Sequence, residues 1–100
     1  MRPAKPYLLH PEAWQEFDTA CDWYLQQSPD TYIRFVAAIF DALEDIAHWP
    51  QTWPAYLHGT RKFVLAKFPY GVIYREQESS VQILAIAHGH RRPGYWKDRR

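Results

Sequence analysis

The sequence has 100 residues, of which 47% are hydrophobic and 17% aromatic, and its formal net charge is +1. This length argues for a single domain over residues 1–100, and the apolar content excludes an intrinsically disordered chain. No apolar stretch approaches the roughly 18 residues of a transmembrane helix, and the N-terminus has no signal-peptide pattern. We therefore expect a cytoplasmic protein that does not associate with a membrane.

The formal charges are divided unevenly along the chain. Residues 11–48 contain eight acidic side chains and one basic side chain, whereas residues 49–100 contain nine basic and three acidic ones. The molecule should therefore be bipolar, although proteins that coat nucleic acid are usually basic overall. The single cysteine, Cys21, excludes an intrachain disulfide, and its apolar neighbours favour a small core side chain over a nucleophile.

The N-terminal half predicts a short strand followed by two helices. Residues 6–9, PYLL, form an apolar run that is typical of an edge strand. Residues 10–27 follow with apolar side chains at spacings of three and four, and Pro11 suits the first helical position. Ser28 can cap a second helix, which ends before Pro50. A connection this short predicts an antiparallel helical hairpin.

After a loop rich in Trp and Pro at residues 49–60, the pattern changes to strands. Residues 61–68, 70–76 and 81–88 are rich in β-branched and aromatic side chains, and residues 77–80 suit a hairpin turn. The predicted fold is of the α+β class, in the order strand, helix, helix, strand, strand, strand. The helical hairpin should pack on one face of a small, mainly antiparallel sheet and leave the other face free.

Cationic, imidazole and aromatic side chains are concentrated in residues 87–100, AHGHRRPGYWKDRR. We expect an ordered extension of the last strand, which Tyr95 and Trp96 anchor by packing on the sheet. The His88-x-His90 pair lacks the further ligands that a metal site needs, so we expect neither a metal nor another cofactor. His88 either ends the last strand and hydrogen-bonds the residues after it, or contacts RNA or a protein target.

These features together resemble the RelE/ParE family of toxins from bacterial type II toxin–antitoxin systems, often described as plasmid-stabilisation proteins. The resemblance covers nearly the whole chain and rests on LHPEAWQEF (9–17), Arg61, FPYGVIY (68–74) and ILAIAHGHRRPGYWKDR (83–99). It implies the RelE/ParE toxin fold and a cognate antitoxin, usually encoded beside the toxin, that wraps and neutralises it.

The resemblance implies two alternative activities. Some family members cleave mRNA in the ribosomal A site, whereas others poison DNA gyrase and are not nucleases. The nuclease members carry arginines at two places: the first is Gly71 in this chain, and the second either falls at Gly89 or is displaced to Arg91. This difference, together with the modest net charge, favours a gyrase inhibitor over a ribosome-dependent mRNA endonuclease. A third alternative is a non-toxic adaptor that keeps the fold.

Two sets of candidate site residues follow. A ribonuclease needs an acid, a base and cations that stabilise the phosphorane. The candidate catalytic residues for that activity are His88, His90, Arg91 and Tyr95. The candidates for binding the antitoxin or the target are Arg61, Lys67, Arg75, Arg91, Arg92, Trp96 and Arg99. We expect the C-terminal arginines to form one basic patch with Arg61 and Arg75, and an acidic antitoxin segment to cover it.

Overall fold

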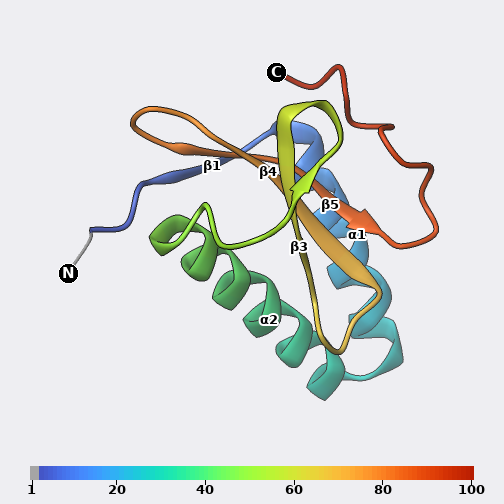
Figure 1. Ribbon diagram of the computed structural model, residues 1–100. Coiled ribbons are helices and arrows are strands. Elements are labelled where there is room, and N and C mark those ends of the chain that lie inside the picture. Colours follow the sequence, from blue (N-terminus) through green and yellow to red (C-terminus); the bar gives the residue numbers. More distant parts are fainter. Residues whose placement is uncertain (1–2) are drawn as a thin grey trace.

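The elements follow the predicted order, with one additional short strand (Figure 1). The computed structural model describes residues 3–100. Along the chain these residues form β1 (Tyr7–Leu9), α1 (Pro11–Gln27), α2 (Pro29–His48), β2 (Ala55–Tyr56), the 3-10 helix η1 (Leu57–Gly59), β3 (Thr60–Val64), β4 (Tyr70–Glu76) and β5 (Val81–His88). The α+β class is therefore confirmed.

Local capping explains where both helices begin. The Nδ1 atom of His10 accepts a hydrogen bond from the N–H of Glu12 at 3.1 Å. Ser28 serves two helices, since its N–H donates to the carbonyl of Tyr24 at 3.0 Å and its hydroxyl accepts from the N–H of Thr31 at 3.4 Å. Ser28 alone connects α1 to α2, as the predicted helical hairpin requires. No helix within residues 3–100 is long and apolar enough to cross a membrane.

The sheet has the strand order β1-β5-β4-β3-β2, in which β1 runs parallel to β5 and the other neighbours are antiparallel. β3 is shorter than predicted: it ends at Val64 and not at residue 68. The chain turns back there, because the N–H of Leu65 donates to the carbonyl of Tyr70 at 3.0 Å. The predicted loop at 49–60 contains β2 and η1. These elements have two and three residues, which is too short for a recognisable pattern of hydrophobic side chains in the sequence.

A bulge in β5 places two consecutive side chains on the same face of the sheet. Ile73 of β4 pairs with Ala85, whereas the next residue, Tyr74, pairs with Ile83, so Leu84 is the extra residue of β5. Ile83 and Tyr74 belong to the core under the helices, while Leu84 and Ala85 belong to a second cluster on the opposite face.

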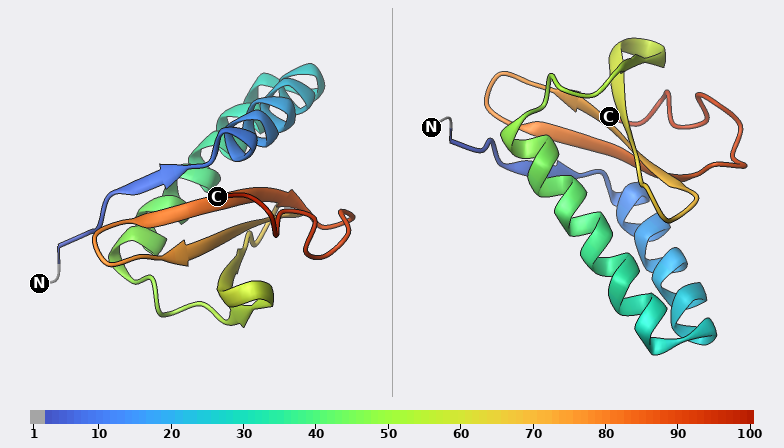
Figure 2. Two further views of the ribbon diagram at one scale, coloured as in Figure 1. Left: turned by 90° about the horizontal axis from the view of Figure 1, so that it is seen from above. Right: turned by 60° about the horizontal axis from the view of Figure 1, so that its bottom comes forward.

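The face of the sheet opposite the helices, here called the outer face, is not free as predicted. Its buried cluster consists of Ile73, Leu84, Ala85, Ala87 and Trp96. Figure 2 shows the helical hairpin on one side of the sheet and η1 on the other. Trp96 is only 2% exposed, and its ring centroid lies 5.8 Å from that of His58 in η1. The C-terminal segment therefore supplies the largest side chain of a second core.

The C-terminal segment that follows β5, residues 89–100, is here called the tail. It is ordered, but it does not extend β5 as predicted. Instead it forms successive turns, in which the N–H of Arg91 donates to the carbonyl of His88 and the N–H of Lys97 to that of Gly94, both at 3.0 Å. Gly94 has a φ of +81°, which favours glycine, and a Cβ there would lie 3.3 Å from Nε2 of His58. The turns bring Trp96 back onto the sheet.

We expect the substitution Trp96→Ala to lower the free energy of unfolding by about 3–5 kcal/mol, because it leaves a cavity in the second core. Urea denaturation followed by circular dichroism measures this loss. Trp49→Ala is the matched control: Trp49 is 53% exposed, so its removal should change stability by less than about 1 kcal/mol. Equal stability of the two variants would contradict the position of Trp96.

Candidate functional site

A largely shielded carboxylate on α1 holds the tail. The Glu16 side chain is 14% exposed, and its Oε1 accepts from the N–H of Ile86 at 3.0 Å and from Nη1 of Arg99 at 2.9 Å. Its Oε2 accepts from the hydroxyl of Tyr95 at 2.6 Å and from Nη2 of Arg99 at 3.0 Å. Arg91 lies at the edge of this group, with Nη1 3.9 Å from Oε2. We call Glu16, Tyr95 and Arg99 the Glu16 clamp.

The Glu16 clamp also covers an open sheet edge. β1 pairs with β5 only as far as Ile83, so no strand formed by residues 3–100 borders the remainder of β5 on that side. There the N–H of Ile86 donates to Glu16, and the carbonyl of Leu84 accepts from Nη1 of Arg99 at 3.0 Å. Side chains from α1 and the tail thus satisfy backbone groups that a strand would otherwise satisfy.

The hydrogen bonds of the clamp occupy the polar groups of two candidate side chains, Tyr95 and Arg99. The Arg99 side chain is 9% exposed, and its guanidinium binds both carboxylate oxygens of Glu16. Burial raises the pKa of Tyr95, and the hydrogen bond to Glu16 raises it further, so this hydroxyl remains a protonated donor. We predicted contact roles for Arg99 and Trp96, but both are buried and hold the tail in place.

His88 and His90 lie where β5 passes into the tail. Nδ1 of His88 accepts from the N–H of His90 at 3.0 Å, and the two ring centroids are 5.0 Å apart. His88 therefore has the structural role that one of its two sequence interpretations assigned. Its ring also meets that of Tyr70 edge-on, with centroids 5.1 Å apart. Within residues 3–100, no three side chains of the metal-binding types gather into a site.

A small hollow on the outer face collects several of the candidates. It has a volume of about 60 Å³, and His88, Arg91, Arg92 and Tyr95 line it together with Lys62 of β3. Such a volume holds roughly two water molecules, which is far less than a nucleotide requires. His90, the fourth candidate catalytic residue, is exposed and does not line this hollow. The hollow can therefore hold a carboxylate group more readily than a base and its sugar.

Arg61 does not join the basic side chains of the tail as predicted. It pairs with Tyr74, which faces the helices, and its Nη1 donates to the carbonyl of Trp53 at 2.7 Å. Side chains alternate along a strand, so the next residue, Lys62, faces the outer side instead. Lys62 is a site residue that the sequence analysis missed, although the alternation of β3 against β4 was a signal for it.

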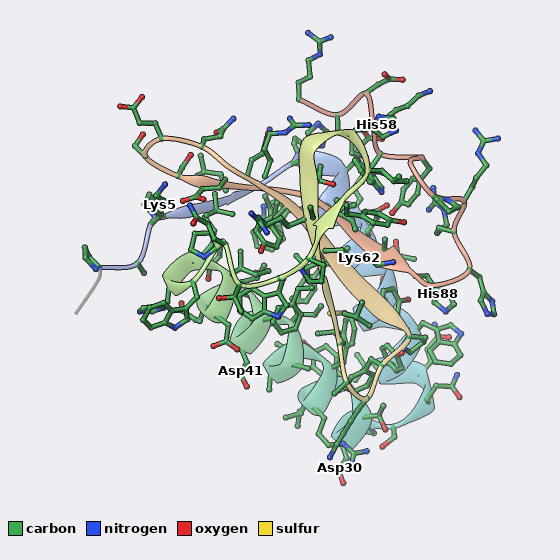
Figure 3. All side chains as sticks on the ribbon, viewed as in Figure 1. Lys5, Asp30, Asp41, His58, Lys62 and His88 are labelled. Atoms are coloured by element: carbon green, nitrogen blue, oxygen red, sulfur yellow. The ribbon has the colours of Figure 1, made fainter. Side chains whose placement is uncertain are left out.

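The basic side chains that do share the outer face are Lys62, Arg75, Arg91 and Arg92, here called the outer basic patch. Lys62 and His88 lie on the tail side of the molecule in Figure 3. Arg75 points to the same face and donates from Nη2 to the carbonyl of His58 at 3.3 Å. Lys67 lies apart, in the loop between β3 and β4 beside α2.

Gly71 and Gly89, which the sequence analysis compared with arginines of the nuclease members, lie at the edge of this patch. A Cβ added to Gly71 would lie 3.0 Å from Cε of Lys62, so the stem of that lysine covers the position. The N–H of Gly89 donates to the carbonyl of Pro69 at 2.8 Å, which ties the start of the tail to the β3–β4 loop. Lysine and tail arginines thus supply the positive charge of this face.

We expect Glu16→Gln to destabilise the protein by about 3 kcal/mol, because it removes the carboxylate that binds the Arg99 guanidinium through two N–H groups and turns an amide N–H₂ toward donors. Equilibrium unfolding in urea measures the loss. Glu12→Gln is the control, since Glu12 is exposed and its Oε2 lies 3.6 Å from Nε of Arg99, a pair worth less than about 1 kcal/mol. A smaller loss for Glu16→Gln than for Glu12→Gln would refute the clamp.

Cys21 is buried among the helices, and burial, with the charges of Asp18 and Asp22, raises its pKa to about 11. This confirms the interpretation of Cys21 as a core side chain.

The thiolate is the reactive form of Cys21, so a pKa raised from 9.0 to about 11 lowers the thiolate fraction at pH 8 roughly a hundredfold. Folded protein should therefore react with a thiol reagent at least that much more slowly than protein in urea. Comparable rates would show that Cys21 is accessible.

Comparison with known proteins identifies the family. Residues 7–93 match the family model described as "ParE toxin of type II toxin-antitoxin system, parDE". Over 66 residues the chain is 36% identical to "Putative toxin Y4kP" from Sinorhizobium fredii (strain NBRC 101917 / NGR234), a match that covers 65% of this chain and 68% of that protein. A solved structure of the chromosomal ParDE TA system from P. aeruginosa shares the fold, with a TM-score of 0.74 at 19% identity over 85% of this chain and 96% of that chain. This chain therefore belongs to the ParE toxin family of type II toxin–antitoxin systems.

Proposed function

We propose that this toxin inhibits DNA gyrase by docking and does not cleave RNA. The observation that carries the proposal is the Glu16 clamp, which uses Tyr95 and Arg99 to hold the tail. Cleavage by a ribose 2′-hydroxyl needs a base that can accept a proton near neutral pH. The hydroxyl of Tyr95 instead donates to Glu16, and burial and this hydrogen bond raise its pKa.

The size of the outer hollow supports the same proposal. At about 60 Å³ it is too small for a nucleotide. A larger hollow of about 350 Å³ also lies beside His88 and Arg91, but Glu12 and Glu16 line it as well, and their charges disfavour a phosphate there. Gly71 adds no charged side chain to this face, where the family's nucleases carry arginine. The exposed cations of the outer basic patch can still bind acidic groups on a protein surface, because docking requires complementary charge and not a proton-transfer geometry.

A ribosome-dependent mRNA endonuclease is the second candidate function. One observation favours it: His88, Arg91 and Tyr95 line a single hollow. In that case His88 would act as acid or base, and Arg91 and Lys62 would contact the phosphate. The choice between the two candidates therefore depends on whether the imidazole of His88 takes part in toxicity.

For the antitoxin, we propose that an acidic segment covers the outer basic patch. Lys62, Arg91 and Arg92 line one hollow whose size suits a carboxylate. An antitoxin segment rich in Asp and Glu would neutralise these cations, associate quickly and block any target that uses the same surface. Neutralisation and toxicity would then compete for one face of the sheet.

Expression of the toxin without its neighbour in a bacterium tests the activity. We expect intact mRNA 5′ ends, trapped gyrase–DNA breaks and an SOS response, and we expect His88→Gln to remain toxic because docking needs no proton transfer. New cleavage at ribosome-associated codons that disappears in His88→Gln would overturn the gyrase proposal in favour of the ribonuclease. Unimpaired growth at high expression would overturn both and favour an adaptor.

Charge reversal tests the antitoxin surface. We expect the double variant Arg91→Glu and Arg92→Glu to bind the cognate antitoxin about tenfold more weakly or worse, mainly through slower association, and with a smaller dependence on salt. Surface plasmon resonance at several salt concentrations measures both effects. Arg34→Glu is the control, because Arg34 is an exposed arginine on α2 beside Lys67, away from the patch. An unaltered salt dependence in the double variant would remove the outer basic patch from the interface.

A further inference from the structure

Five aromatic rings form a continuous ladder from the C-terminal half of α1 to the tail. Centroid distances are 5.1 Å from Trp23 to Tyr24, 6.3 Å from Tyr24 to Tyr70, 5.1 Å from Tyr70 to His88 and 5.0 Å from His88 to His90. Three separate elements supply these rings: α1, β4 and the junction of β5 with the tail. The ladder therefore runs from the helix side of the sheet to His88, which also lines the hollow of the outer basic patch.

Part of this ladder encloses a hollow. Trp23, Tyr24, Pro69, Tyr70 and His88 line a volume of about 370 Å³, and every one of them contributes a ring. Trp23 is 57% exposed, so its ring lies at the rim of this hollow and does not belong to the core. We call this hollow the aromatic cage. Its volume is large enough for a long side chain from a partner protein.

The hydroxyl groups at the cage differ from those elsewhere in the protein. The hydroxyl of Tyr74 donates to the carbonyl of Pro50 at 2.6 Å, and that of Tyr95 donates to Glu16 at 2.6 Å. Among the described residues, the hydroxyls of Tyr24 and Tyr70 have no such partner, and neither is sealed from solvent. Two phenolic oxygens are therefore free to accept hydrogen bonds from a ligand in the cage.

The electrostatic surroundings of the cage favour a cation. It includes α1, and residues 11–48 carry a formal charge of −7. Burial raises the pKa of Tyr70, and groups that carry negative charge when ionised, Glu16 among them, raise it further. The adjoining hollow beyond His88 is lined by two arginines and two glutamates, so the formal charges of its walls cancel. Nothing in the cage wall itself carries a permanent positive charge.

We propose that the aromatic cage binds an arginine side chain of a partner protein. Ring faces attract cations, and Trp provides the strongest attraction of the aromatic residues. A guanidinium is planar, stacks on rings and carries five N–H donors, which suits a slot with two open phenolic oxygens better than a lysine ammonium does. Identification of the partner as the antitoxin rests on the proposed function, whereas the chemistry of the cage does not.

The cage can be tested with the isolated toxin at pH 8. The probes are N-acetyl-arginine methylamide and its uncharged isostere N-acetyl-citrulline methylamide, titrated while the indole N–H signals and the His88 ring signals are followed by NMR. We expect saturable shifts at Trp23 and His88 with the arginine compound, with a Kd in the millimolar range. The citrulline compound should bind about fivefold more weakly or worse, because it lacks the charge.

Variants locate the site. Trp23→Ala should abolish the His88 shifts, whereas Trp14→Ala, which removes another exposed tryptophan of α1, should leave them unaltered. Tyr70→Phe keeps the ring and removes one acceptor, so it should weaken the arginine compound and leave the citrulline compound less affected. Equal binding of the two probes, His88 shifts that survive Trp23→Ala, or no saturation would each overturn the proposal. Since neither gyrase nor the antitoxin is present, the result is independent of the proposed function.

Discussion

The C-terminal third of this toxin depends on the largely shielded carboxylate of Glu16. That group joins three parts of the chain: α1, the unpaired edge of β5 and the tail, through the N–H of Ile86 and the side chains of Tyr95 and Arg99. An ion pair that is shielded from water is stabilised by further hydrogen bonds, and here Arg99 also donates to the carbonyl of Leu84. Because the clamp fixes the tail, it also determines that Trp96 closes the second core.

The same bonds constrain the chemistry that the protein can perform. A tyrosine that donates to a buried carboxylate cannot also accept a proton from a substrate, and a guanidinium that binds two carboxylate oxygens cannot neutralise a phosphorane. Order in the tail and catalysis therefore compete for Tyr95. Among the cations, Lys62, Arg91 and Arg92 remain available, and the hollow that these three share is too small for a nucleotide. They suit contact with an acidic protein surface.

Local features of the fold could be predicted from the sequence, whereas the long-range contacts of the site could not. Ser28 and Pro11 mark helix ends through nearby backbone groups, and the change of hydrophobic period after the Trp/Pro loop marks the sheet. Glu16 looks like any solvated acid of an amphipathic helix, because its partner Arg99 is 83 positions away. The bulge at Leu84 changes which face each following residue of β5 occupies, and no alternating pattern reveals it. The prediction of a free sheet face failed for the same reason, since the second core exists only when the tail folds back.

The net charge of the chain is near zero, but its surface combines a basic patch with an acidic half. The outer basic patch and the acidic helices lie on different sides of the sheet, and the aromatic cage adjoins the patch at His88, so a partner that wraps the toxin would meet both. Suppose that an acidic segment of the partner covers the patch while an arginine of the same partner enters the cage. If the partner bound in the opposite direction, its arginine would meet the basic patch and its acidic segment would meet the acidic helices. Each contact is modest alone, but the two together would fix the direction and the register in which the partner binds. A bipolar toxin can in this way select one antitoxin among related ones without a large apolar surface.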